Sequence, residues 1–202
     1  MQITQAKSIL LQQQSEWSKV FAEESERQNY IQYGVIMTVI AHVAMFIGNA
    51  FIVSSITAFG GFGFGPGYFA VFEGIQAVLA VAMLYIVPQI LAAVAPSFGG
   101  QNNTLSATKL YVFSMTPAWI GMMFGILPVI GWLGAIAGGI YGIYLFWQHV
   151  TEAMSVPEDK KVVYVIVAVL AIAVVSWVVS AIAHSIAGAM FVSSIVHPGR
   201  VF

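Results

Sequence analysis

Five long apolar stretches, separated by short polar or glycine-rich connections, constrain this sequence more than any other feature. They cover residues 33–58, 68–94, 107–126, 129–150 and 162–190. A transmembrane helix requires about 20 consecutive apolar residues, and each stretch reaches that length. Only 7% of the residues are charged, whereas a soluble domain carries about 25%. The sequence therefore predicts an all-α polytopic membrane protein, folded as a five-transmembrane-helix bundle.

Charge and cysteine content exclude several classes of function. Seven Lys and Arg residues against eight Asp and Glu residues leave no basic surface for nucleic acid, so no nucleic-acid partner is expected. The chain has no cysteine, which excludes disulfides and thiolate metal sites. The partners that remain are membrane lipids, other membrane proteins and further copies of the chain.

Residues 1–32 form the most polar segment and contain no apolar core typical of a signal peptide. Apolar residues recur there at helical spacing, which predicts an amphipathic helix. We expect that helix on the membrane surface, with Trp17 at headgroup depth, or against the cytosolic ends of the bundle, and the two arrangements are compatible. We therefore divide the chain into a cytosolic N-terminal segment, 1–32, and a membrane domain, 33–202.

The distribution of basic residues predicts the orientation in the membrane. With a cytosolic N-terminus and five spans, the inner segments are 1–32, 95–108 and 151–161. Only Arg200 then lies outside, whereas six basic residues lie in these segments or at their boundary: Lys7, Lys19, Arg27, Lys109, Lys160 and Lys161. This bias follows the positive-inside rule. It requires a tight external hairpin at Pro128 and an external C-terminus.

Several motifs resemble those of one known family. They are Ala95-Pro-Ser-Phe-Gly-Gly-Gln-Asn102, Tyr111-Val-Phe-Ser-Met-Thr-Pro-Ala-Trp119, Gly139-Ile-Tyr-Gly-Ile-Tyr-Leu145 and Met154-Ser-Val-Pro-Glu-Asp-Lys-Lys161. In this order they resemble the bacterial branch of the Yip family of integral membrane domains, which is named for interaction with Ypt/Rab GTPases. The resemblance covers nearly the whole chain.

The resemblance implies five spans, a cytosolic N-terminus and a periplasmic C-terminus in a bacterial inner membrane. Eukaryotic members of the family are tied to vesicle traffic, membrane shaping and GTPase binding. This sequence lacks their Asp-Leu-Tyr-Gly-Pro motif and their long N-terminal region, so the resemblance does not support GTPase binding here. It implies a non-enzymatic, membrane-organising or interaction protein.

Four polar side chains on three spans are expected to share one depth in the membrane. His42 lies about 14 Å from the inner surface if span one begins near residue 33. The side chains expected at that level are Ser114, Thr116 and Tyr141. Pro117 also frees a backbone carbonyl nearby. We expect an interhelical polar cluster, with either a structural role or a role in solute or proton binding.

Glu73 is the carboxylate expected inside a span, about one turn into the second stretch. We interpret it as an interfacial carboxylate that the helix N-terminus stabilises, with proton or cation binding as the alternative. His184 is expected about 17 Å from the depth of His42, so a histidine metal site is not predicted.

Glycines recur every four residues on spans three and four, at Gly121 and Gly125 and at Gly134, Gly138 and Gly142. Such small-residue faces allow helix backbones to approach closely. We expect the two spans to form a tight antiparallel hairpin.

No catalytic constellation, metal-ligand spacing or cofactor motif is present in the sequence, so we expect a protein that is not an enzyme and has no cofactor. Two alternatives to the organising role stay open. One is a small-solute or ion transporter or channel, suggested by the His42 layer and Glu73. The other is an accessory subunit of a larger membrane complex.

Overall fold

A computed structural model describes residues 14–23, 26–59 and 64–196, and every regular element in these ranges is a helix. This agrees with the predicted all-α class. The elements are α2 (Gln14–Ala22), α3 (Arg27–Gly48), the π-helix η1 (Asn49–Val53), α4 (Ser54–Phe59), α5 (Pro66–Val94), η2 (Ala95–Phe98), α6 (Thr104–Met123), η3 (Phe124–Ile126), α7 (Pro128–Met154) and α8 (Glu158–Val196).

Prolines and polar caps set several of the helix boundaries. Pro66 and Pro128 begin α5 and α7, where a residue without an N–H loses no helical hydrogen bond. Asn103 caps α6 by accepting a hydrogen bond from the backbone N–H of Ser106. Gly99 has a positive φ of 79° and ends the short η2 segment, a conformation that favours glycine.

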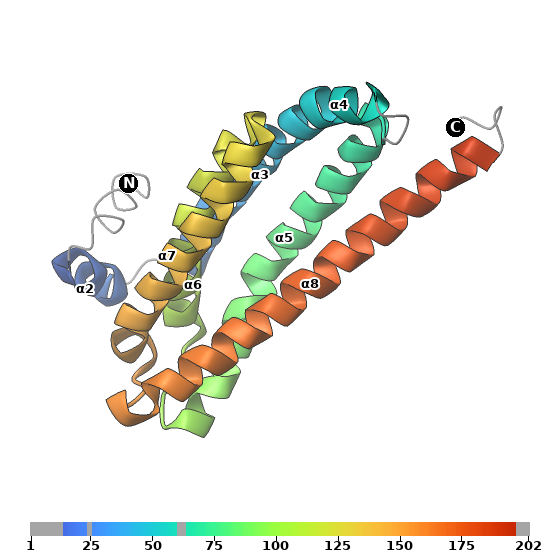
Figure 1. Ribbon diagram of the computed structural model, residues 1–202. Helices are drawn as coiled ribbons and strands as arrows, with labels where there is room; N and C mark the ends of the chain where they lie inside the picture. The colour runs from blue at the N-terminus through green and yellow to red at the C-terminus, as the bar shows by residue number, and fades with distance from the viewer. Residues whose placement is uncertain (1–13, 24–25, 60–63, 197–202) are drawn as a thin grey trace.

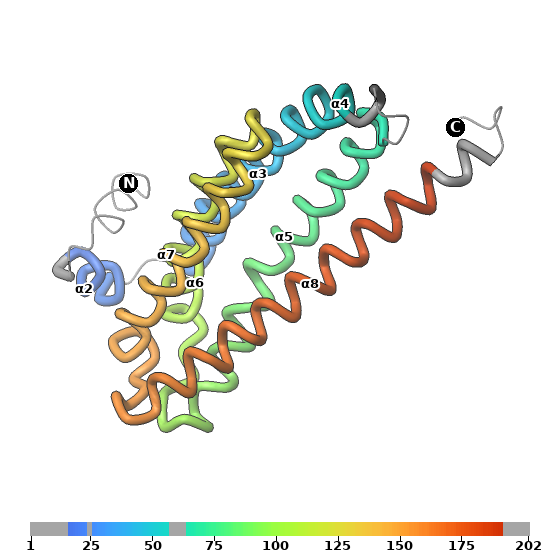
Figure 2. The backbone as a smooth tube through the Cα atoms, in the orientation of Figure 1, coloured from blue at the N-terminus to red at the C-terminus, as the bar shows by residue number. Residues whose placement is uncertain are grey.

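The long helices run roughly alongside one another (Figure 1). α6 and α7 form a closely packed antiparallel pair, and α3 packs on α6. α5 lies between α3 and α8, and α4 turns across the end of the molecule where α5 begins. The smooth backbone trace shows α8 alongside α5 for most of its length (Figure 2).

Glycines line the contact between α6 and α7. A Cβ on Gly121 would collide with the backbone of Gly134, and a Cβ on Gly138 would collide with the carbonyl of Pro117. Gly142 faces the carbonyl of Ser114 in the same way. Gly125 lies in η3 and packs against Met45 of α3. These contacts bring backbone against backbone, which side chains larger than hydrogen would prevent.

Among the described residues, four helical segments are long and apolar enough to cross a membrane. They are Arg27–Ile56, Pro66–Phe98, Pro128–Met154 and Glu158–Phe191. α6 does not belong to this set, although span three was predicted there. It carries Lys109 and several hydroxyl side chains, and most of its residues are buried by α3, α5 and α7. Because neighbouring helices cover α6, it needs less apolar surface than a helix that faces lipid.

The N-terminal helix α2 packs on the ends of α6 and α7. Trp17 is fully buried, and its ring stacks on that of His149 at a centroid distance of 4.1 Å. Lys109 Nζ donates hydrogen bonds to the carbonyls of Val20 (2.8 Å) and Glu23 (2.6 Å), and a cation at this end of a helix is favourable. Of the two arrangements expected, the structure shows the packing of α2 on the bundle, and the position of Trp17 at headgroup depth stays a prediction.

Replacing Trp17 with alanine is expected to release α2 from the bundle. A buried tryptophan truncated to alanine costs about 3–5 kcal/mol, and α2 has few other buried side chains. Trypsin cleavage after Lys19, which is exposed, should therefore become faster in the Trp17→Ala variant. Glu16→Ala, which removes only a surface ion pair, is the matched control and should leave the cleavage rate unchanged.

Candidate functional site

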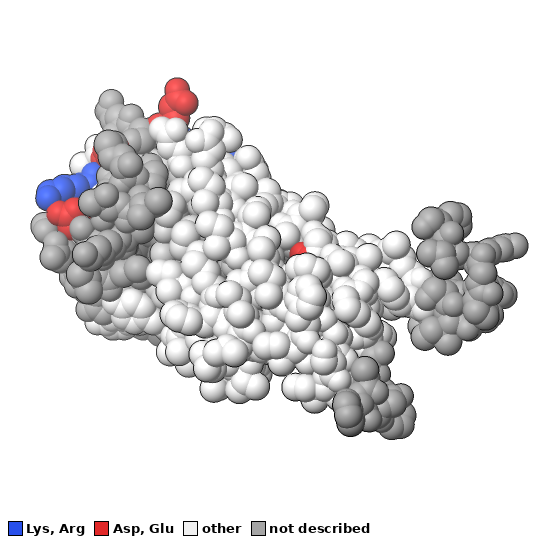
Figure 3. All heavy atoms as spheres, turned by 90° about the horizontal axis from the view of Figure 1, so that it is seen from above, with Lys and Arg blue, Asp and Glu red and all other residues white. Residues whose placement is uncertain are grey.

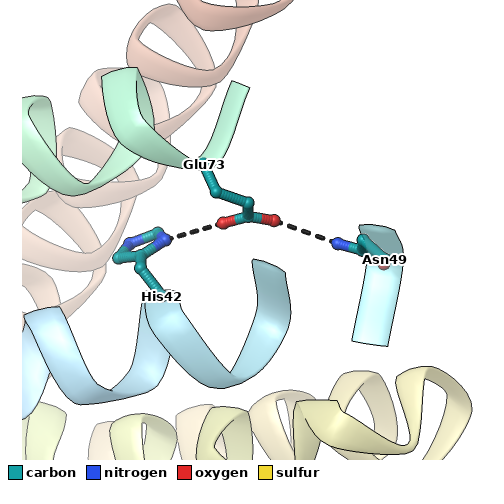
Figure 4. A network of polar contacts seen from close by, with 3 residues as sticks. All are labelled: His42, Asn49 and Glu73. Atoms are coloured by element: carbon teal, nitrogen blue, oxygen red, sulfur yellow. Dashed lines mark hydrogen bonds and ion pairs between the residues drawn. The ribbon is translucent and has the colours of Figure 1, made fainter. Parts of the chain in front are cut away.

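A network of three polar side chains joins α3 to α5 within the apolar part of the molecule (Figure 4). His42 Nδ1 lies 2.9 Å from Glu73 Oε2, and Asn49 Nδ2 donates a hydrogen bond of 3.0 Å to Glu73 Oε1. The Glu73 side chain is 7% exposed and that of His42 is 12% exposed. Each carboxylate oxygen of Glu73 thus has one partner on α3 or at its end.

The positions of these residues follow from helix geometry. His42 and Asn49 are seven residues apart, about two turns, so both face α5. Asn49 is the first residue of the π-helix η1, and π-helical turns inside α-helices are frequent at functional sites. The preceding Gly48 lies directly against the carbonyl of Gly125, and this contact holds the end of α3 in place.

The charge of the network is unusual for its surroundings. Charged side chains gather at the end of the molecule that carries α2, and the long helices show a surface almost without charge (Figure 3). Among the described residues, no Lys or Arg forms an ion pair with Glu73. A buried carboxylate is costly unless it is paired and hydrogen-bonded, so His42 and Asn49 are what stabilise it.

The network borders a groove of about 230 Å³ between α3 and α5. Apart from His42 and Glu73, the lining is apolar or small: Val39, Val43, Phe46, Ala70, Gly74 and Ala77. A Cβ added at Gly74 would meet no other atom within 4 Å, so this part of the groove is unfilled. The second ring nitrogen of His42 points away from Glu73 (Figure 4).

The predicted layer of His42, Ser114, Thr116 and Tyr141 does not form one network, and this expectation is corrected. Thr116 Oγ1 lies 3.1 Å from Tyr33 Oη. Ser114 Oγ is buried without a hydrogen-bond partner among the described residues, and the Tyr141 ring packs beside that of Tyr144.

The error lay in the relative offset of the helices. Thr116 of α6 is level with Tyr33 of α3, which lies nine residues, or about 14 Å, before His42. Further along α3, His42 meets Glu73 of α5 instead. Glu73 was expected about one turn into its span, stabilised by the helix N-terminus, whereas it lies about two turns into α5. Its pairing with His42 and the role of Asn49 were missed. The seven-residue spacing of His42 and Asn49 was the available signal.

The remaining histidines lie elsewhere. His149 is buried under Trp17, and His184 of α8 packs against the edge of the Phe72 ring, with centroids 4.3 Å apart. In the part of the chain that the structure describes, no three potential metal ligands come together.

Comparison with known proteins gave one match. A family model described as the Yip1 domain matches residues 7–180. That range contains the whole of each described helix from α2 to α7. It also contains the first part of α8, residues 158–180. The search of curated proteins and the search of solved structures found no significant match.

Proposed function

Because this chain belongs to the Yip1 domain family, we propose that it is a non-enzymatic integral membrane protein that organises its membrane through contacts with lipids and other membrane proteins. The proposed site of action is the bacterial cytoplasmic membrane. The N-terminus faces the cytosol and the C-terminus faces the periplasm. In this topology α6 also crosses the membrane, in addition to the four long apolar segments, which makes five crossings. The bias of basic residues toward the cytosolic segments supports this orientation.

The observation that carries the proposal is the large apolar surface of α7 and α8. In an 18-residue apolar stretch of α7 only 22% of the residues are buried, and in a stretch of the same length in α8 only 17% are buried. Leu170, Val174 and Trp177 lie on one face of α8 and are 59%, 60% and 72% exposed. Trp132 and Ile140 of α7 are 61% and 66% exposed. In the membrane such a face contacts lipid or the apolar helices of a partner.

Site-specific photo-crosslinking tests this proposal. A photoreactive phenylalanine in place of Trp177 should form adducts with membrane proteins or with a second copy of the chain when cells are irradiated. The matched control is the same residue in place of Trp119, an aromatic side chain of α6 that is 5% exposed, and it should form none. Adducts that contain lipid alone at Trp177 would contradict a role in protein interaction.

A further inference from the structure

The groove between α3 and α5 has the chemistry of a site that accepts hydrogen bonds. If Glu73 is a carboxylate, the proton between it and His42 belongs to Nδ1. The neutral imidazole then presents Nε2 as an acceptor. A carboxylate has lone pairs beyond the two that His42 and Asn49 use. The polar atoms at the groove therefore favour a ligand that donates hydrogen bonds.

The charge of the network favours a ligand that carries a positive charge. With a neutral imidazole the network carries one negative charge, and within the described ranges no Lys or Arg pairs with Glu73. An uncompensated charge at such a site is costly. A ligand with a positive charge and N–H donors would offset that cost.

The position of the groove indicates where such a ligand comes from. The segment Pro66–Phe98 has 33 residues, or about 50 Å, against a hydrocarbon core of about 30 Å. Glu73 is about 10 Å from its start, so it lies near the edge of the core, within reach of lipid headgroups. The apolar residues Val39 and Ala77 continue the groove further from that edge, where an acyl chain would lie.

We propose that this groove binds a phospholipid with a primary ammonium headgroup, with the ammonium donating to Glu73 and one acyl chain lying along Val39, Gly74 and Ala77. In the proposed topology the lipid belongs to the outer leaflet. The inference rests on the proposed function for the placement of the chain in a membrane.

Titration of the detergent-purified protein with lipid tests the inference. Dioleoyl-phosphatidylethanolamine should raise the melting temperature with an apparent affinity ~10-fold higher than dioleoyl-phosphatidylcholine, which has the same chains but no N–H donor. A tenfold preference is the size expected from one charge-assisted hydrogen bond. Dioleoyl-phosphatidylglycerol, which offers hydroxyl donors on an anionic headgroup, should bind as weakly as phosphatidylcholine.

Two variants locate the site. Gly74→Leu fills the groove without touching the network, and it should abolish the preference while leaving the melting temperature without lipid near that of the wild type. Gly139→Leu, at another helical glycine whose Cβ position is open, should retain the preference. Equal affinities for phosphatidylethanolamine and either other lipid would overturn the proposal, as would an undiminished preference in Gly74→Leu. Crosslinks from Trp177 do not depend on this groove, so failure here leaves the proposed function standing.

Discussion

Replacing Gly138 with alanine is expected to lower the melting temperature of the protein markedly, although only one methyl group is added. That methyl would occupy the position of the Pro117 carbonyl on the facing helix, so α6 and α7 would have to separate. Overpacking of a tight contact costs about 1–3 kcal/mol, and backbone on both sides leaves no flexible side chain to absorb the change.

The neighbouring glycine provides the control. A Cβ at Gly139 meets nothing within 4 Å, so Gly139→Ala should leave the melting temperature unchanged or raise it. Alanine is more favourable than glycine in a helix by about 0.5–1 kcal/mol. Thermal unfolding in one detergent measures both variants. Equal losses of stability in the two would contradict the close packing of α6 on α7.

His42→Leu is expected to destabilise the protein because it leaves Glu73 buried with Asn49 as its one hydrogen-bond partner among the described residues. Leaving a buried hydrogen-bonding group without one of its partners costs about 1–3 kcal/mol, and more where the group is charged. His42→Gln should be tolerated better, since an amide can still donate to the carboxylate. The measurement is the melting temperature at fixed pH, in the same detergent for every variant.

A double-mutant cycle separates this pairing from general effects of substitution. His42→Leu with Glu73→Leu removes both partners, so the double variant should be more stable than His42→Leu alone. Residues in direct contact show interaction energies of about 0.5–3 kcal/mol, whereas independent sites add. Additive losses would show that His42 and Glu73 do not stabilise each other.

Helix class and the main packing face followed from the sequence because each rests on a local pattern. Apolar length predicted helices for the membrane, Pro128 marked the turn between α6 and α7, and glycines spaced by four residues indicated which faces meet. The four-residue spacing needs no knowledge of the rest of the fold, since it describes one side of one helix.

The partner of His42 and the place of Trp17 depend on contacts between segments far apart in the chain. The offset between α3 and α6 places Thr116 beside Tyr33 rather than beside His42, and no local pattern reveals that offset. An amphipathic helix with Trp17 fits a lipid surface and a protein surface equally well. The contacts of Trp17 with His149 and Phe113 involve residues far along the chain, so the pattern of the N-terminal segment does not reveal them.

Whether α6 crosses the membrane is the central question for the proposed topology. The depth of the His42–Glu73–Asn49 network and the lipid-facing sides of α7 and α8 both depend on it. The chain has no cysteine, so single cysteines at Asn102 and Leu127, on either side of α6, can be labelled in intact cells with a membrane-impermeant maleimide. We predict that Leu127→Cys is labelled from outside and Asn102→Cys only after the cells are opened. Labelling of both positions from the same side would show that α6 does not cross, and it would contradict the five-span account.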